Sequence, residues 1–131
     1  MKQLKALLID DVKLIRSELK LILADFKRIK VVGEAGNVSQ ALRMIREKKP
    51  DILFLDIHLP DSSGFDLLDM ITDSPDVIFI SSYFYKYSSK IKNYNPVGLL
   101  SKPIRRESLY STLENLLEKH GTKEKNNGSS G

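Results

Sequence analysis

The sequence predicts an α/β fold in which a parallel sheet carries helices on both faces. Five short apolar runs of strand length occur along the chain, and segments with helical periodicity separate them. The run Ile52–Leu55 is apolar at every position, which favours a strand buried on both faces. Because strands that alternate with helices connect through right-handed crossovers, the strands are expected to be parallel.

The strands are expected at residues 6–9, 31–32, 52–55, 77–80 and 97–100. Between the first two strands, apolar residues from Ile15 to Phe26 recur at spacings of three and four, which predicts an amphipathic helix. The second helix is expected to begin after an N-cap at Asn37, with Gln40 as its capping-box partner. It should end before Pro50, since the residue before a proline disfavours helical backbone.

The later helices are predicted with less regular patterns. A short third helix should follow Gly64 and cover 65–71, and a final amphipathic helix should cover 109–117. The segment between the fourth and fifth strands, FYKYSSKIKNY, holds few strong helix formers, so we expect a frayed or mobile element there. Residues 1–120 are expected to form one domain. Residues 121–131 contain no apolar side chain and should be disordered, and their GSSG ending resembles a cloning remnant.

Composition excludes several classes of protein. No apolar run approaches the ~20 residues of a membrane span, and acidic residues follow the N-terminus too early for a signal peptide. The chain has no cysteine, which excludes disulfides and thiolate chemistry. The net charge of +4 is spread along the chain without a basic, aromatic-interleaved stripe. We therefore expect a cytoplasmic domain with no membrane contact and no direct binding to nucleic acid.

Polar side chains follow four of the five predicted strands, at the edge where doubly wound folds bind ligands. They are Asp10, Asp11, Asp56, Ser81, Ser82 and Lys102. Carboxylates packed together favour a bound cation, and an oxygen-only ligand set suits Mg²⁺. A carboxylate beside Mg²⁺ and a lysine is suited to attack a phosphoryl group, which makes Asp56 a candidate phosphoryl acceptor.

Each of these residues also has an ordinary structural explanation. Asp10 and Asp11 are suited to capping the helix that follows them, the serines to forming a turn, and Lys102 to solvent exposure. What favours a functional site is that all of these polar residues fall at one edge of one sheet.

The pattern resembles the receiver domain of two-component response regulators. The resemblance rests on Asp10-Asp11, on Asp56 followed by Leu59-Pro60-Asp61-Ser62-Ser63-Gly64, on Ser81 and on Lys102-Pro103, and it covers residues 4 to about 119. It implies a flavodoxin-like sheet in the order 2-1-3-4-5 with five helices. It also implies that a sensor histidine kinase transfers a phosphoryl group from its phosphohistidine to Asp56.

The resemblance further implies a role for each site residue. Mg²⁺ would be bound by the side chains of Asp11 and Asp56, by the backbone carbonyl of His58 and, through water, by Asp10. The remaining roles concern the phosphoryl group: Lys102 would pair with its oxygens, Ser81 would hydrogen-bond one of them, and the backbone at Ser82 would assist. The Lys102-Pro103 bond would be cis.

Three regions bear on how such a switch would work. Leu99 stands where the family usually has an aromatic residue that turns inward on activation, which argues against coupling through a rotating aromatic. His58 and Tyr83 stand where the family tunes dephosphorylation, and their bulk predicts a shielded, longer-lived acyl phosphate. The signalling face would carry Tyr85, Tyr87, Lys90, Arg105 and Arg106, and a phosphorylation-driven homodimer through this face is an expectation from the family.

The phosphoacceptor switch is not expected to be an enzyme beyond self-phosphorylation and slow autodephosphorylation. Two other functional classes are alternatives to it. Mg²⁺-dependent phosphohydrolases usually have a second acid two residues after the nucleophile, and here that residue is His58. A pseudo-receiver would bind partners without phosphorylation, which the complete set of site residues disfavours. The DIHLPDSSGFDLL and LSKPI segments resemble receivers of LytTR-type transcription regulators, so an effector domain, joined or separate, is the expected output partner.

Overall fold

The computed structural model describes residues 2–128, with side chains described as far as Gly121. Its elements, in chain order, are β1 (Leu4–Ile9), α1 (Lys13–Leu23), β2 (Ile29–Ala35), α2 (Val38–Lys48), β3 (Ile52–Asp56), α3 (Gly64–Met70), β4 (Asp76–Ser81), the 3₁₀ turn η1 (Phe84–Tyr87), α4 (Ser88–Lys92), β5 (Gly98–Ser101) and α5 (Arg106–Gly128). All five predicted strands and five predicted helices are therefore present, and their ends lie within a few residues of the predicted ones except for α5, which ends eleven residues later than predicted.

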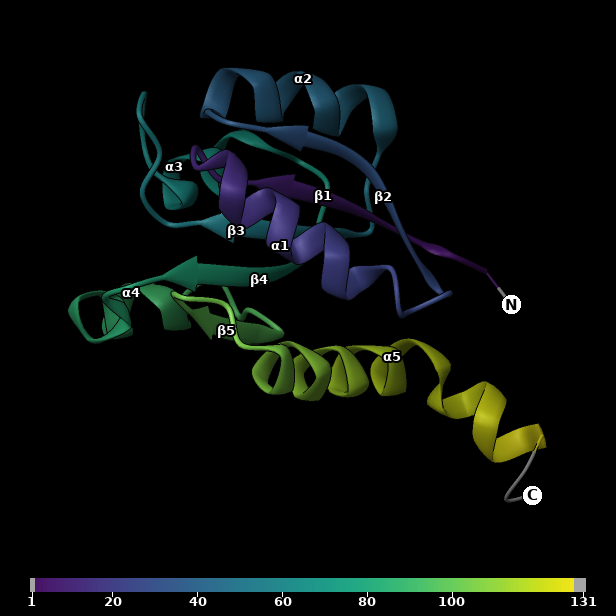
Figure 1. Cartoon of the computed structure of the whole chain (residues 1–131). Coiled ribbons are helices and arrows are strands. Elements are labelled where there is room, and N and C mark those ends of the chain that lie inside the picture. The colour runs from purple at the N-terminus through teal and green to yellow at the C-terminus, as the bar shows by residue number, and fades with distance from the viewer. Residues whose placement is uncertain (1, 129–131) are drawn as a thin grey trace.

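The five strands form one parallel sheet in the order β2-β1-β3-β4-β5, which confirms the predicted fold and order (Figure 1). β3 occupies the centre, and all five of its residues are buried. β2 carries a bulge at Val32, since Ala6 pairs with Val31 and Leu7 pairs with Gly33. The carboxyl ends of β1 and β3 are neighbours, so this topology brings Asp10 and Asp11 close to Asp56.

Two apolar clusters cover the two faces of the sheet. Ile52 and Phe54 of β3 pack into the cluster that includes buried residues of α1 and α5. Leu53 and Leu55 pack into the cluster beneath α2, α3 and α4. Each side chain of this kind stabilises the fold by about 1.5–3 kcal/mol when fully buried. The apolar run Ile52–Leu55 of β3 thus reflects burial on both faces, as predicted.

The start of α2 follows the predicted capping pattern with one difference. The Asn37 side chain accepts a hydrogen bond from the Gln40 backbone N–H at 2.8 Å, which confirms the N-cap. The Gln40 side-chain oxygen accepts from the Gly36 N–H at 2.9 Å rather than from that of Asn37, so the reciprocal bond lies one residue further back. Lys49 ends the helix in the left-handed conformation, with φ 47°, immediately before Pro50.

Three segments differ from the predicted elements. α1 ends at Leu23, and Phe26, predicted to lie on this helix, packs edge-on against Tyr110 of α5 from outside it. The weakly predicted fourth helix is a 3₁₀ turn followed by a five-residue α-helix. α5 continues to Gly128 through part of the segment expected to be disordered, because residues 122–125 include good helix formers and no proline. Residues 129–131, to which the same expectation applied, lie outside the described residues.

Within residues 2–128, none of the helices combines the length and apolar character that a membrane span requires.

Candidate functional site

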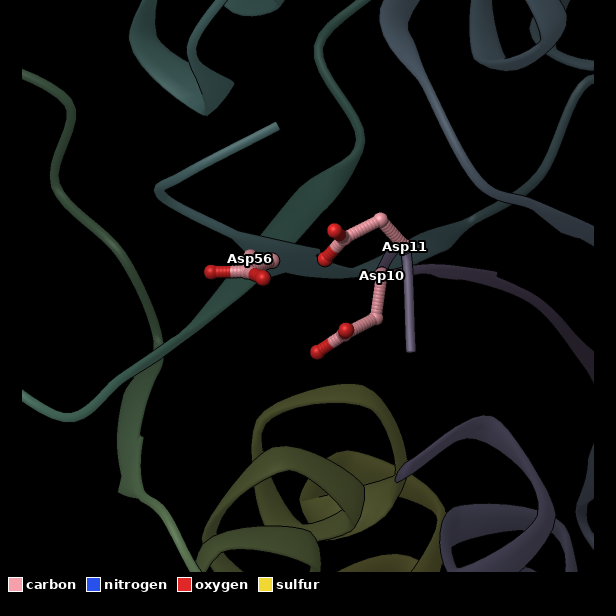
Figure 2. Close-up of side chains that lie close together, drawn as sticks. All are labelled: Asp10, Asp11 and Asp56. Atoms are coloured by element: carbon pink, nitrogen blue, oxygen red, sulfur yellow. The ribbon is translucent and has the colours of Figure 1, made fainter. Parts of the chain in front are cut away.

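Three carboxylates meet at the carboxyl ends of β1 and β3. Asp10 and Asp11 directly follow β1, and Asp56 is the last residue of β3. One oxygen from each lies within 4.8 Å of the others, and Figure 2 shows the three groups converging on one region. Asp10 and Asp56 are buried, whereas Asp11 is exposed. The predicted acidic trio is therefore brought together by the neighbouring positions of two strands.

Lys102 lies between the two buried carboxylates. Its Nζ donates to Asp56 Oδ2 at 3.0 Å and lies 3.0 Å from Asp10 Oδ2. The second contact is an ion pair without hydrogen-bond geometry, so Asp10 Oδ2 is a buried oxygen that accepts no hydrogen bond in the described structure. The Lys102 backbone N–H donates to Ser81 O at 3.1 Å, which fixes the lysine beside the end of β4. The Lys102-Pro103 peptide bond is cis, as the resemblance implied.

These surroundings raise the pKa values of both Asp56 and Lys102. Burial raises the pKa of Asp56, and the nearby Asp10 charge raises it further, while hydrogen bonds from Lys102 and the His58 N–H partly oppose the increase. Burial acts to lower the pKa of Lys102, but its hydrogen bond to Asp56 and its charge interactions with Asp56 and Asp10 outweigh that effect and raise the pKa. Lys102 is thus held as a cation between groups that carry an excess of negative charge.

Backbone and arginine contacts fix the orientation of the carboxylates. Asp56 Oδ1 accepts from the His58 N–H at 3.0 Å, and Asp10 Oδ1 accepts from the Val12 N–H at 2.9 Å. Arg16 of α1 donates to the Asp10 backbone oxygen at 2.6 Å and also pairs with Glu34 of β2. Arg16 gave no signal of this role in the sequence, where it is one of many basic residues along the chain.

A cavity of about 290 Å³ opens above Asp56. Its lining consists of Asp11, Asp56, His58, Leu59, Pro60, Ser82, Tyr83 and Lys102. Ser81 is buried behind this lining, and its hydroxyl oxygen accepts from the Tyr83 N–H at 2.9 Å. The predicted residues Ser82, His58 and Tyr83 therefore border the cavity, whereas the Ser81 hydroxyl is engaged beside it.

His58 has a partner that its position in the sequence did not reveal. A hydrogen bond of 2.8 Å joins His58 Nε2 to the Tyr87 hydroxyl, and the two rings meet edge-on at 5.2 Å. Tyr87 ends η1, and its ring also packs against Phe65 of α3 at 5.9 Å. No local sequence pattern links residues 58 and 87, because their contact depends on how the loops after β3 and β4 fold.

Asp61 also has a role that sequence reasoning missed. Its carboxylate accepts from the backbone N–H groups of Val38 at 2.8 Å and Ser39 at 3.2 Å. These bonds hold the pKa of Asp61 below its usual value, since they favour the ionised form. The loop after β3 is therefore joined to the N-terminus of α2, which helps to fix the wall of the cavity.

The residues predicted for the signalling face come from η1, α4 and the start of α5, on both sides of the sheet. Tyr85 is 76% exposed. Lys90 lies over the Phe65 ring at 4.9 Å, on the side of the sheet covered by α2, α3 and α4. Arg105 is exposed, but Arg106 pairs with Asp25 at 2.9 Å and lies beside Tyr110, which packs against the opposite core cluster. Leu99, at the position of the missing aromatic, is 46% exposed on β5.

The donor set fits a hard divalent cation. All three clustered groups offer carboxylate oxygens, one of the buried oxygens lacks a hydrogen bond, and a single lysine offsets three acidic groups. Carboxylates that leave room for water ligands are the usual Mg²⁺ ligands in proteins. Asp10, Asp11 and Asp56 are therefore the residues that would hold Mg²⁺.

Comparison with known proteins agrees with this geometry. The family described as the response regulator receiver domain matches residues 6–114. The chain belongs to this family. An uncharacterized response regulatory protein of Vibrio cholerae is 40% identical over 119 residues, which are 89% of this chain and 50% of that protein. The sensory transduction protein LytT of Enterococcus faecalis is 34% identical over 118 residues, which are 88% of this chain and 48% of LytT.

Solved receiver domains share the fold. The receiver domain of a modulated diguanylate cyclase from Desulfovibrio desulfuricans superposes with a TM-score of 0.78 at 25% identity, and the match covers 93% of this chain and 99% of that one. The anti-anti-sigma factor PhyR of Bartonella quintana gives a TM-score of 0.80 at 26% identity over 92% of this chain and 50% of PhyR. This receiver domain spans about half the length of the curated relatives it matches.

Proposed function

We propose that this receiver domain is a phosphoacceptor switch in which Asp56 takes a phosphoryl group from a sensor histidine kinase in the cytoplasm. The observation that carries the proposal is the position of Asp56. Its carboxylate is buried at the end of the central strand, 3.0 Å from Lys102 and grouped with Asp10 and Asp11, yet it borders an open cavity. A carboxylate with only a structural role would not need access to that cavity.

The chemical step is a transfer from nitrogen to oxygen. A carboxylate oxygen of Asp56 attacks the phosphorus of the kinase phosphohistidine, a P–O bond forms, and the P–N bond breaks. The electron pair of that bond returns to the imidazole nitrogen, which then takes a proton from water. The hydrogen bond from Lys102 favours the ionised form of Asp56, which is the form that attacks, and so opposes the effect of burial on the pKa of this carboxyl group.

Lys102 would remain as the positive partner of the phosphoryl oxygens, because its Nζ already lies at the carboxylate that would carry the group. Mg²⁺, when bound by Asp10, Asp11 and Asp56, would supply charge stabilisation for the transferring group. Two further predictions remain part of this proposal. The first is that the backbone carbonyl of His58 would be a further Mg²⁺ ligand, and the second is that Ser81 would turn to bind a phosphoryl oxygen. In the second case, the bond between Ser81 and the Tyr83 N–H must break first.

We also propose that the phosphorylated domain acts on an effector domain that regulates transcription. Relatives such as LytT are about twice as long as this chain, and the BtsR protein of Salmonella typhi is named a transcriptional regulatory protein. The exposed candidates for contact with that partner, or with a second receiver in a phosphorylation-driven homodimer, are Tyr85, Lys90, Arg105 and Arg106.

The test is the intact mass after incubation with Mg²⁺ and acetyl phosphate. Wild type should gain one phosphoryl group, and Asp56→Asn should gain none. Asp73→Asn removes an exposed carboxylate outside the site and is the matched control, so it should behave as wild type. Chelation of Mg²⁺ should abolish the gain.

Two results would overturn the proposal and favour one of the two alternative functions. A folded wild-type protein that takes up no phosphoryl group would favour a pseudo-receiver that works without phosphorylation. Continuous release of phosphate from simple phosphate esters, lost in Asp56→Asn, would instead indicate a phosphohydrolase.

A further inference from the structure

We infer that Tyr87 is a positioning residue for His58 and that the pair controls how long the phosphoryl group stays on Asp56. This inference rests on the proposed function. Its structural basis is the contact between the two side chains, in which a 2.8 Å hydrogen bond is combined with an edge-on ring contact at 5.2 Å. A hydrogen bond and a ring contact together restrict both the position and the rotation of the imidazole.

His58 is placed where its orientation affects access to Asp56. It lies two residues after Asp56, its own N–H donates to Asp56 Oδ1, and its side chain borders the cavity above that carboxylate. Water must pass through this cavity to attack an acyl phosphate on Asp56. A ring held at the cavity wall narrows that approach, whereas a ring free to rotate into solvent would leave it open.

Tyr87 is itself held firmly enough to serve this purpose. Its ring packs against Phe65, which is 2% exposed and contacts Phe79 of β4 at 5.3 Å and Tyr94 at 5.2 Å. Tyr94 in turn donates to Asp69 of α3 at 2.8 Å. The hydroxyl of Tyr87 is therefore presented from a packed aromatic cluster, not from a freely rotating side chain.

η1 is joined to the site at both ends. At its start, the N–H of Tyr83 donates to the hydroxyl of Ser81, and at its end Tyr87 contacts His58. The turn is only four residues long, so both contacts constrain the same short segment. The hydrogen bond with the Tyr87 hydroxyl also occupies His58 Nε2, which is then not available to hold an attacking water molecule.

The experiment compares the decay of phosphorylated protein in Tyr87→Phe, His58→Ala and the double variant. Each is phosphorylated with acetyl phosphate and Mg²⁺, the donor is removed, and the phosphorylated fraction is followed by intact mass. Tyr87→Phe keeps the ring against Phe65 and removes only the hydroxyl. Tyr110→Phe removes a hydroxyl that bonds Asp25 on the opposite side of the sheet from Tyr87, and it is the matched control.

We expect Tyr87→Phe to shorten the lifetime about threefold or more and His58→Ala to shorten it at least as much. In the His58→Ala background, Tyr87→Phe should add nothing, and Tyr110→Phe should leave the lifetime unchanged. The ¹⁵N chemical shifts of the His58 ring should change in Tyr87→Phe without phosphorylation, while the urea midpoint stays close to that of wild type. A purely structural role for Tyr87 would change the midpoint without changing the ring signals of His58.

The outcomes separate this inference from the function on which it rests. If all variants take up the phosphoryl group and lose it at the wild-type rate, the positioning role is wrong and the phosphoacceptor function stands. Multiplicative effects of the two substitutions would also overturn it, because they would show that Tyr87 acts without His58. If no variant, including wild type, takes up the group, the proposed function fails and this inference fails with it.

Discussion

Gly64→Ala is expected to destabilise the domain, because Gly64 lies against the backbone of β3. A Cβ atom at this position would lie 2.6 Å from the backbone oxygen of Asp56, 3.0 Å from Leu55 Cγ and 3.3 Å from Ile57 Cα. Two of these atoms belong to the backbone and cannot move away by a side-chain rotation. The Gly64 N–H also donates to Ile57 O at 2.8 Å, which keeps the start of α3 close to the strand end.

The size of the effect follows from two opposing contributions. Overpacking a well-filled site costs typically 1–3 kcal/mol, and a clash with backbone belongs near the upper end, at about 3 kcal/mol. Replacing glycine by alanine within a helix returns about 1 kcal/mol. The unfolding free energy should therefore fall by about 2 kcal/mol. Because the clash is with the carbonyl of Asp56 itself, phosphorylation by acetyl phosphate should also slow.

Gly36→Ala is the matched control for this prediction. A Cβ atom on Gly36 would meet its nearest neighbours at 3.7 Å, which is ordinary contact, and none of the described glycines has a positive φ. The substitution should raise stability by about 0.4–1 kcal/mol, because it restricts only the unfolded chain. Urea unfolding midpoints measure both effects. A midpoint for Gly64→Ala at or above that for Gly36→Ala would refute the steric argument.

Other contacts give further predictions, each measured by urea unfolding. Lys102→Met leaves two buried carboxylates without their cation and should cost about 3–5 kcal/mol at pH 7, so an unchanged midpoint would show that Lys102 does not stabilise the fold. Burial acts to raise the pKa of Asp76, but hydrogen bonds from Lys119 and His120 lower it below its usual 3.8. The ionised carboxylate therefore stabilises the fold above pH 3.8. This contribution is lost as the pH falls through the pKa of Asp76 in the folded protein. Asp76→Asn should therefore cost about 1 kcal/mol at pH 7 and progressively less as the pH falls below 3.8, and a difference that does not shrink in acid would contradict this origin. Asn37→Ala should cost about 1 kcal/mol and Asn37→Ser much less, whereas equal losses would exclude the capping bond.

The sheet and the acidic cluster could be predicted because local sequence determines them. An apolar run such as Ile52–Leu55 must be buried on both faces, and the parallel topology then brings its terminal Asp56 to the same edge as Asp10 and Asp11. Lys102 was found in the same way, as a charged residue directly after the last strand. These predictions depended on strand ends, which the apolar pattern determines well.

The contacts that surround the cluster could not be predicted, because they join loops distant in sequence. The bond between Tyr87 and His58 depends on the path of a 3₁₀ turn, for which the segment has no distinctive pattern. Asp61 was noted only as part of a motif, and its capping of α2 depends on how the loop after β3 folds. The ion pair of Arg106 with Asp25 joins the first turn of α5 to the loop after α1, and no local pattern links these two positions.

The two edge strands described above bear on the behaviour of the protein at high concentration. An open sheet edge presents unpaired N–H and C=O groups to other copies of the chain, and such edges can seed aggregation. β5 offers only four residues, with Pro96 shortly before it and Pro103 shortly after, and proline cannot donate a backbone hydrogen bond. At the opposite edge, β2 is interrupted by the bulge at Val32 and carries the exposed Lys30. Both edges are therefore poor templates for strand addition, which should help the protein to remain dispersed when it is abundant.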